Sequence, residues 1–218
     1  MTPGTDLENI RALPRPIWRR VLAQPDRALE LIALAAADRF AEPATRWVQV
    51  AGGGHSPASL AQVAHRKHVR LSRAEGLVLG VGGIATGAAN LAGLMWLQAR
   101  MVFFIAAAHG YDPAHPMRPA ELLALWDVYE TPAEARAALD GLGTPMAQAF
   151  VEQRLSKGGE RRLSERLARY LGKRFATRLG ARLVPLIGAP ISAIQNGGST
   201  GQLGRSALAY YGGERAKT

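Results

Sequence analysis

The chain has 218 residues, of which 48% are hydrophobic, and a mean hydropathy of -0.04, which fits one good-sized core and argues against a polytopic membrane protein. It contains no cysteine, so disulfides, thiolate chemistry and cysteine-based zinc sites are excluded. Its net charge of +10 predicts an anionic partner, either nucleic acid or anionic lipid headgroups.

The N-terminal segment, residues 1–16, carries early acidic residues and prolines and lacks the apolar core of a signal peptide. We therefore expect no secretory signal, and either a cytosolic chain or one docked on the cytosolic face of a membrane. We divide the chain into an N-terminal extension (1–24), one helical domain (25–212) and a C-terminal tail (213–218).

Strand signals are nearly absent along the chain, whereas helix caps and helix breakers are frequent. Pro25 precedes residues 26–40, whose apolar positions recur at helical spacing without a β-branched cluster. We expect Pro43 to break this helix, and a second helical stretch to run to the glycines at 52–54.

The next segment begins with Ser56 and Pro57, which are typical of an N-cap and a first helical residue and predict a helix through His68. The basic run at 65–70 on this helix is either a solvated face or a contact for phosphates and headgroups. The sequence Ser-Arg-Ala-Glu at 72–75 has the pattern of a capping box, so we expect another helix to begin there.

A charge-free run follows, in which Gly76, Gly80, Gly83 and Gly87 recur at steps of four, three and four. On one helix these glycines share a face, where a second backbone can approach closely. The run also has the length of a membrane span. It therefore predicts either close packing inside a soluble bundle, or insertion into or docking on a membrane.

One unbroken helix over residues 73–108 would be about 54 Å long, more than the diameter of a small domain. We therefore expect a kink or a hairpin turn near 82–83 or near 90–93. Farther along, residues 101–109 continue the apolar pattern up to Gly110, a natural residue for ending a helix.

Gly110, Tyr111 and Asp112 are predicted to form a structural turn, with a left-handed glycine and a tyrosine folded back on the helix. The alternative is a catalytic or metal site that also uses His109 and His115. A metal site needs further ligands, and the nearby sequence offers none. We assign no catalytic residue, no metal ligand and no cofactor to this chain.

Beyond this turn, Pro119 opens a helix expected over 120–130, and the capping box at 131–134 opens another that ends near 141–143. Residues 151–182 hold ten Lys or Arg and three Glu, a net charge of +7. This segment predicts a long basic amphipathic helix, whose cations face either an anionic surface or simply water. The four cations at helical spacing are Arg162, Arg166, Arg169 and Lys173.

The last apolar run, 183–204, is free of charge but interrupted by Pro185, Pro190 and two glycines at 197–198. These interruptions favour two short helices or a hairpin over a single helix. The predicted fold is therefore all-α, a helical bundle with two Gly-rich apolar helical segments or hairpins and one long basic amphipathic helix.

Four stretches carry a family resemblance. Residues 74–90 form a small-residue apolar run, 105–113 read IAAAHGYDP, 181–196 read ARLVPLIGAPISAIQN, and 204–211 read GRSALAYY. They resemble the Gly-rich helix, the IA-x-x-YGYD signature, the R-x-x-P-x-x-G element and the closing x-R-x-A-x-x-YY of the EcsC family, a group of bacterial all-helical proteins.

This resemblance extends over about residues 28–211 and departs from the family pattern at Pro190, where a small helical residue is expected. The family is named for an open reading frame beside an ABC-transporter pair, which implies a membrane-linked role. The resemblance supplies no reaction and no catalytic residue.

Taken with the charge pattern, these features predict a membrane-associated, non-enzymatic accessory protein on the cytoplasmic side of the inner membrane, peripheral or partly inserted. Its expected partner is an anionic membrane surface or a membrane protein, such as a transporter subunit. The alternative is a soluble helical protein that binds a protein partner. A nucleic-acid binder and a hydrolase are weaker alternatives, because the sequence has neither helix-turn-helix spacing nor a catalytic motif.

Overall fold

The computed structural model describes residues 13–78, 84–141 and 189–213, and these residues form helices and no strand. The predicted all-α fold is confirmed. In chain order the elements are α2 (Arg15–Ala23), the short 3-10 helix η1 (Pro25–Arg27), α3 (Ala28–Ala51), α4 (Pro57–Val78), α5 (Ile84–Ala108), α6 (Arg118–Leu125), α7 (Pro132–Asp140) and α10 (Ala189–Gly212).

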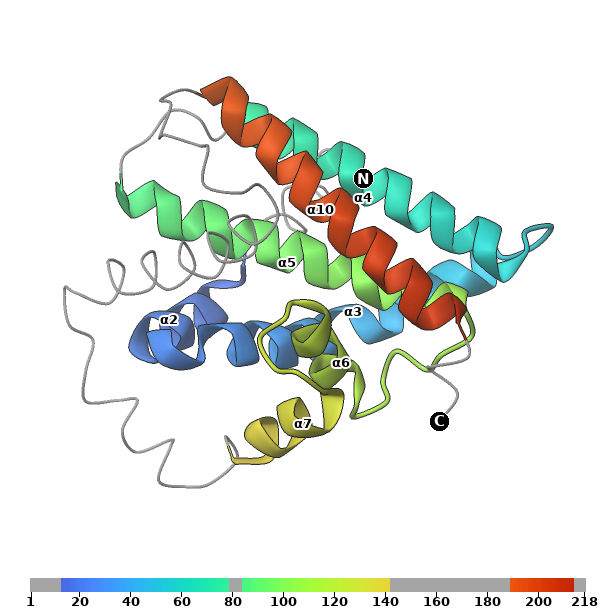
Figure 1. Ribbon diagram of the computed structural model, residues 1–218, viewed down its shortest axis with the longest axis horizontal. Coiled ribbons are helices and arrows are strands. Elements are labelled where there is room, and N and C mark those ends of the chain that lie inside the picture. The colour runs from blue at the N-terminus through green and yellow to red at the C-terminus, as the bar shows by residue number, and fades with distance from the viewer. Residues whose placement is uncertain (1–12, 79–83, 142–188, 214–218) are drawn as a thin grey trace.

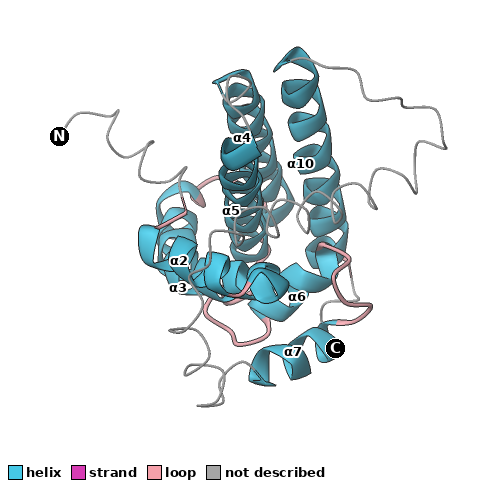
Figure 2. Cartoon of the chain, turned by 90° about the vertical axis from the view of Figure 1, so that its left-hand side faces the viewer, coloured by secondary structure: helices cyan, strands magenta, loops and turns pink. Residues whose placement is uncertain are grey.

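Three long helices, α4, α5 and α10, lie side by side and form one layer of the molecule (Figure 1). α4 and α5 are consecutive and antiparallel, and α10 runs antiparallel to α4 and in the same direction as α5. The helices α2, α3, α6 and α7 make up a second layer beneath them, as the turned view in Figure 2 also shows. The C-terminal end of α4 and the N-terminal ends of α5 and α10 therefore lie at the same end of the layer.

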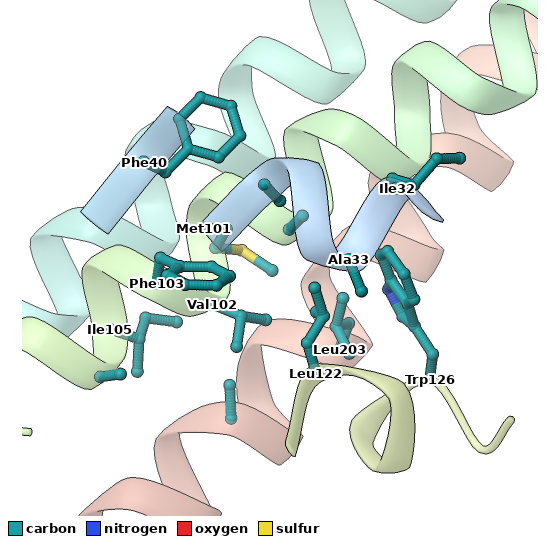
Figure 3. Close-up of a cluster of buried hydrophobic side chains, with 14 of the residues drawn as sticks. Ile32, Ala33, Phe40, Met101, Val102, Phe103, Ile105, Leu122, Trp126 and Leu203 are labelled. Carbon is teal, nitrogen blue, oxygen red and sulfur yellow. The ribbon is translucent and has the colours of Figure 1, made fainter. Parts of the chain in front are cut away.

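The hydrophobic core lies where α3 crosses α5 and continues down to α6 (Figure 3). Phe40 of α3 stacks on Trp96 of α5, with ring centroids 4.6 Å apart, and Trp47 stacks on Phe104 at 5.3 Å. Val21 of α2 is also fully buried in this core, so α2 packs with the rest although it precedes residue 25.

Pro43 does not break α3, contrary to the sequence prediction, because the helix continues through it to Ala51. A proline in a helix removes one backbone hydrogen bond and costs about 3 kcal/mol. Here Phe40 precedes the proline and Trp47 follows it, and both rings stack on α5. Tertiary packing on both sides of Pro43 therefore holds the helix together.

The helix break predicted before residue 72 is also wrong, because α4 continues from Pro57 to Val78. Ser56 is the N-cap as expected, and its hydroxyl accepts the backbone N–H of Ser59 at 3.2 Å. Ser72 is buried inside the layer, where its hydroxyl lies 2.9 Å from that of Thr200 on α10. Its side chain therefore bonds across helices and does not cap a new one.

The hairpin expected within the glycine-rich run lies between Val78 and Ile84, and α5 then passes through 90–93 without a break. Gly76 consequently lies on α4 and Gly87 on α5, while Gly80 and Gly83 lie outside the described residues. The four glycines therefore do not share one face of one helix, because the chain turns back between them.

The break predicted at 197–198 is wrong as well, since α10 is one helix from Ala189 to Gly212. Pro190 is its second residue, where the backbone N–H would have no partner inside the helix, so proline costs little there. The glycines at 197–198 lie inside the helix, next to the buried residues Ser199 and Thr200, which contact α5. Pro185 lies outside the described residues.

The short helices after Gly110 follow the predicted caps closely. Thr131 is the N-cap of α7, and its hydroxyl accepts the backbone N–H of Glu134 at 3.2 Å. Glu134 in turn accepts the N–H of Glu130 at 3.2 Å. α6 ends at Leu125, earlier than expected, and Asp127 then takes a left-handed φ of 57°.

Candidate functional site

The turn after α5 has the geometry of a Schellman motif around Gly110, whose φ is 86°. The N–H of Gly110 donates to the carbonyl of Ala107 at 2.9 Å, and that of Tyr111 donates to Ala106 at 3.1 Å. These two bonds supply donors to carbonyl groups that have no partner within the helix at its C-terminal end. The chain therefore leaves α5 in a fixed direction and presents Tyr111 beside α10.

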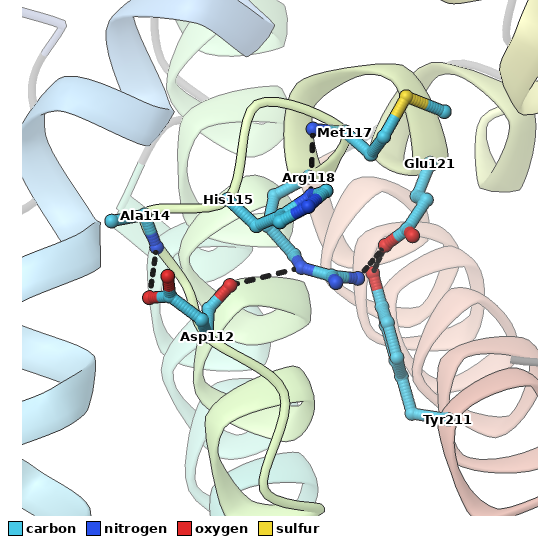
Figure 4. A network of polar contacts seen from close by, with 7 residues as sticks. All are labelled: Asp112, Ala114, His115, Met117, Arg118, Glu121 and Tyr211. Atoms are coloured by element: carbon cyan, nitrogen blue, oxygen red, sulfur yellow. Dashed lines mark hydrogen bonds and ion pairs between the residues drawn. The ribbon is translucent and has the colours of Figure 1, made fainter. Parts of the chain in front are cut away.

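Asp112 builds the next part of this turn (Figure 4). Its carboxylate accepts the backbone N–H of Ala114 at 2.9 Å, and its backbone carbonyl accepts the Nε–H of Arg118 at 3.0 Å. His115 accepts the N–H of Met117 through Nδ1 at 3.3 Å. The polar groups of Asp112 and His115 thus form bonds within the turn and direct Arg118 toward α10.

Arg118, Glu121 and Tyr211 form a buried polar cluster between α6 and α10 (Figure 4). The Arg118 guanidinium is ion-paired with the Glu121 carboxylate. The Tyr211 hydroxyl donates to the same carboxylate oxygen at 2.7 Å. A buried carboxylate is stable only when it is paired and hydrogen-bonded, and both conditions are met here.

Aromatic rings surround this cluster. The rings of Tyr111 and Tyr211 are 5.3 Å apart, Tyr210 lies 4.9 Å from Tyr211, and the Arg118 guanidinium lies 5.2 Å from the Tyr111 ring. The HGYD turn and the C-terminal YY pair, about 100 residues apart in the sequence, therefore meet around one arginine.

The chemistry available to this cluster is structural. Burial raises the pKa of the Tyr211 hydroxyl well above its usual value, and the nearby Glu121 carboxylate adds to the effect, so the hydroxyl stays protonated. The Glu121 carboxylate accepts hydrogen bonds from both Arg118 and Tyr211. The cluster fixes α10 to α6.

Metal binding finds no support in the described part of the chain, where no group of three or more His, Asp or Glu side chains comes together. His109 instead packs against α10, where a Cβ at Gly212 would lie 3.2 Å from its Cε1. Burial lowers the pKa of His109.

A second polar cluster crosses the α4–α5–α10 layer itself. Besides the bond from Ser72 to Thr200, the amide of Gln98 on α5 lies 3.4 Å from the hydroxyls of Ser199 and Thr200. All four side chains are buried. This cluster fixes which residues of the three helices lie at the same level.

His65 and His68 of α4 are directed inward, so the predicted basic run contributes only part of its residues to the surface. His65 Nε2 donates to the carbonyl of Gly201 on α10 at 3.2 Å. His68 Nδ1 donates to the carbonyl of Ala64 at 2.7 Å, and burial lowers its pKa to about 3. Both rings are therefore neutral at physiological pH.

The four other cations of α4, which are Arg66, Lys67, Arg70 and Arg73, are exposed. A groove of about 510 Å³ lies among them, lined by Val63, Arg66, Lys67, Arg70 and Leu71. This surface combines positive charge with an apolar floor, which suits an anionic amphiphile better than a small polar anion.

The strongest predicted anionic-surface residues, Arg162, Arg166, Arg169 and Lys173, lie outside the described residues. Among the described helices, one stretch is long and apolar enough to cross a membrane, and it is Leu91–Ala108 of α5. However, 83% of it is buried inside the protein, where it forms the core beneath α4 and α10. This stretch therefore packs as a core helix of the bundle.

Sequence reasoning missed the contacts of Arg118, Glu121 and Tyr211, because these residues are joined only by the fold. It also passed over Arg100 and Arg205, the residues that end the two charge-free runs. The position of each arginine, directly after an uncharged apolar run, was the sequence feature that could have singled them out.

One of three comparisons with known proteins found a match. The sequence model of the EcsC protein family matches residues 57–212, which begin at the first residue of α4 and end at the last residue of α10. A search of curated proteins and a search of solved structures each found no match. The family match covers most of the chain, and the protein therefore belongs to the EcsC protein family.

Proposed function

We propose that this protein is a non-enzymatic accessory protein that associates with the cytoplasmic side of a membrane through one end of its α4–α5–α10 layer. In this function it assists a membrane protein, such as a transporter subunit, and catalyses no reaction of its own. The buried Arg118–Glu121–Tyr211 cluster supports the non-enzymatic part, because each of its polar groups is already engaged by another.

The observation that carries the proposal is the absence of charge at one end of the layer. We call this the uncharged end: residues 76–78 of α4, 84–99 of α5 and 189–204 of α10. Because α4 runs antiparallel to α5 and α10, these three segments lie at the same end of the layer (Figure 1). An end without Asp, Glu, Lys or Arg can enter a hydrocarbon layer without the cost of burying a charge.

The length of the uncharged end favours partial insertion. On α5, residues 84–95 precede Trp96 and its contact with Phe40 of α3, and these twelve uncharged residues rise about 18 Å. A hydrocarbon core is about 30 Å thick. One leaflet of that core is about 15 Å deep, which this end is long enough to fill. The helix ends would therefore lie within the bilayer without crossing it.

A second candidate is a soluble helical protein that binds a helical partner. The observation in its favour is the burial of Leu91–Ala108, which shows that the most apolar part of α5 already has protein neighbours. Under this alternative the uncharged end would contact a protein groove and would not bind lipid alone.

The experiment that separates the two candidates combines fractionation with vesicle flotation. The untagged full chain is expected in the membrane fraction, to resist a high-salt wash, and to float with pure lipid vesicles. Ile84→Asp places a charge in the uncharged end and should reduce flotation about tenfold or more. The matched control is Val50→Asp, because Val50 is 87% exposed and lies on α3, outside the α4–α5–α10 layer.

Three outcomes would count against membrane association. They are a wild-type protein that stays in the soluble fraction, a protein that fails to float with any vesicle, and equal flotation of the two variants. A soluble protein that still forms a stable complex with a purified membrane protein would establish the second candidate.

A further inference from the structure

We infer that a belt of cations at the base of the uncharged end is a contact surface for the phosphates of anionic phospholipids. The belt consists of Arg66, Lys67, Arg70, Arg73, Arg100 and Arg205. The inference rests on the proposed function and deepens it, because it names the lipid class and the residues that would recognise it.

Positive and negative residues are distributed unequally between the helices. Together α4, α5 and α10 contain the six Lys and Arg residues of the belt and a single carboxylate, Glu75. The acidic residues of the other described helices lie on α3, η1, α6 and α7. The layer that carries the uncharged end is therefore strongly cationic.

The belt residues lie at a similar height along the three helices. Ser72 and Gln98 both contact Thr200, and His65 contacts Gly201, so residues 65–72 of α4, 98–100 of α5 and 200–205 of α10 lie beside one another. Arg100 and Arg205 are the first charged residues after the uncharged segments of their helices. The cations thus lie where the uncharged end stops.

The height of the belt fits the headgroup region of a bilayer. Arg66 and Arg73 are seven residues apart on α4, which corresponds to about 10 Å along the helix. The headgroup layer on each side of a bilayer is about 5–8 Å thick, and its charge acts within a further Debye length. If the uncharged end enters the hydrocarbon, the belt is at the depth of the lipid phosphates.

Among the side chains that the structure describes, these cations have no anionic partner. The ion pairs of the described side chains involve Arg27, Arg46, Arg118 and Arg136, and none involves a belt residue. The guanidinium of Arg100 instead lies 5.0 Å from the centre of the Phe104 ring. An unpaired cation held against an aromatic ring retains its attraction for an external phosphate.

The cations also share one electrostatic field. The pKa of Arg100 is lowered by burial and further by Arg39 of α3. Burial lowers the pKa of His65 as well, and Arg205 and Arg66 lower it further. Neighbouring positive charges from α3, α4, α5 and α10 therefore repel one another, and a bound anion would relieve that repulsion.

The groove on α4 explains why a phospholipid suits the belt better than a nucleic acid. Val63 and Leu71 provide an apolar floor among the cations, which matches the junction of a headgroup and its acyl chains. Nucleic-acid surfaces combine cations with exposed aromatic rings on which bases stack. Among the described residues Val50 is the one large hydrophobic residue that is exposed, so no such ring lies on the belt.

The test compares two triple variants of the full chain that remove the same charge. Arg66→Gln, Arg70→Gln and Arg73→Gln change the belt, whereas Arg15→Gln, Arg19→Gln and Arg20→Gln change α2. All six residues are exposed, and each variant lowers the net charge from +10 to +7. Binding is measured on vesicles of phosphatidylcholine alone and on vesicles that also contain phosphatidylglycerol.

The unmodified protein is expected to prefer the anionic vesicles, with a preference that weakens as salt rises. The belt variant should bind the anionic vesicles about a hundredfold more weakly, and the α2 variant should bind them nearly as tightly as the unmodified protein. Binding to neutral vesicles should be equal for all three proteins.

Several results would overturn the inference. Equal losses in the two variants would assign the effect to net charge alone. A loss that follows substitution of Arg162, Arg166, Arg169 and Lys173 by Gln, with the belt variant unaffected, would place the contact elsewhere. Tighter binding of a short RNA or DNA duplex than of vesicles, abolished in the belt variant, would identify a nucleic-acid surface.

The same experiment distinguishes a failure of the proposed membrane function from a failure of the belt inference. If the unmodified protein binds no vesicle, the proposed function fails and the belt inference fails with it. If it prefers anionic vesicles and the belt variant does so equally, the membrane function stands and the belt inference alone is wrong.

Discussion

The imidazole ring of His65 on α4 occupies the space that a side chain at Gly204 on α10 would need. A Cβ at Gly204 would lie 2.2 Å from the ring's Cδ2 and 3.2 Å from its Cγ. The same ring donates a hydrogen bond to the carbonyl of Gly201, one helical turn earlier. The two helices are therefore in contact through a histidine on one side and backbone on the other.

We predict that Gly204→Ala destabilises the fold by about 1–2 kcal/mol, because the ring must move and lose its bond to Gly201. Gly201→Ala is the matched control. There a Cβ would be in ordinary contact, 3.7 Å from an Arg205 nitrogen, so the gain in helix propensity should stabilise by up to about 1 kcal/mol. Equal unfolding free energies for the two variants in urea titrations would contradict this account.

Gly110→Ala should lower the free energy of unfolding by about 1–2 kcal/mol. The cause is backbone strain alone, since φ is 86° and no atom lies within 4 Å of the added methyl group. Gly53→Ala provides the comparison, because its methyl also meets open space and its backbone is outside the left-handed region. A melting experiment in which both variants behave like the unmodified protein would refute the role of Gly110.

Tyr211→Phe removes one of the two donors to the Glu121 carboxylate and leaves the ring in place. A hydrogen bond from a buried donor to a charged group is worth about 1.5–3 kcal/mol, and a loss of this size is expected in urea unfolding. Tyr210→Phe should change stability little, because the Tyr210 hydroxyl has no hydrogen bond to the described residues. Similar losses in the two variants would mean that the hydroxyl of Tyr211 adds nothing specific.

Stability should decrease as the pH falls below 6.5, and His68 is expected to contribute to this loss. Burial lowers the pKa of His68 to about 3, so below pH 6.5 the unfolded chain binds a proton that the folded chain does not. The free energy of unfolding then falls by about 1.4 kcal/mol for each pH unit. The lowered pKa values of His65 and His109 act in the same direction.

The measurement is urea unfolding at pH 7.5, 6.0 and 5.0, a range in which most carboxylates remain ionised. His68→Leu should reduce the loss between pH 7.5 and pH 5.0 by about 1–2 kcal/mol, whatever its effect on absolute stability. An unchanged pH dependence in this variant would show that His68 is protonated in the folded protein.

Local signals in the sequence predicted local structure well. Ser56, Thr131 and Gly110 each act on backbone groups within one helical turn, so their residue types are enough to indicate a helix start or end. The long charge-free run indicated a kink or hairpin near 82–83 or near 90–93, because a single helix would have outgrown the domain, and the chain turns back between Val78 and Ile84.

The wrong predictions share a physical cause, which is that distant contacts outweigh local breakers. Pro43 stays inside α3 because rings on both sides of it stack on α5. Ser72 bonds to Thr200, a residue 128 positions away, and so does not cap a helix. Gly204 is closely packed against His65, a contact between residues 139 positions apart that no local pattern indicates.

The buried cluster was beyond sequence reasoning for the same reason. Glu121 and Tyr211 are 90 residues apart, and no spacing rule links α6 to the end of α10. The family resemblance contained both of the flanking motifs, HGYD and YY, yet it did not show that they meet around Arg118.

The position of α3 has a practical consequence for anyone who trims this protein. The family match starts at Pro57, six residues after α3 ends at Ala51, and a fragment cut to residues 57–212 would lack that helix. Without Phe40 and Trp47, the rings of Trp96 and Phe104 would face water as one apolar patch. Such a fragment is expected to self-associate during purification. Binding of the fragment to lipid or to other proteins would therefore not report on the intact molecule.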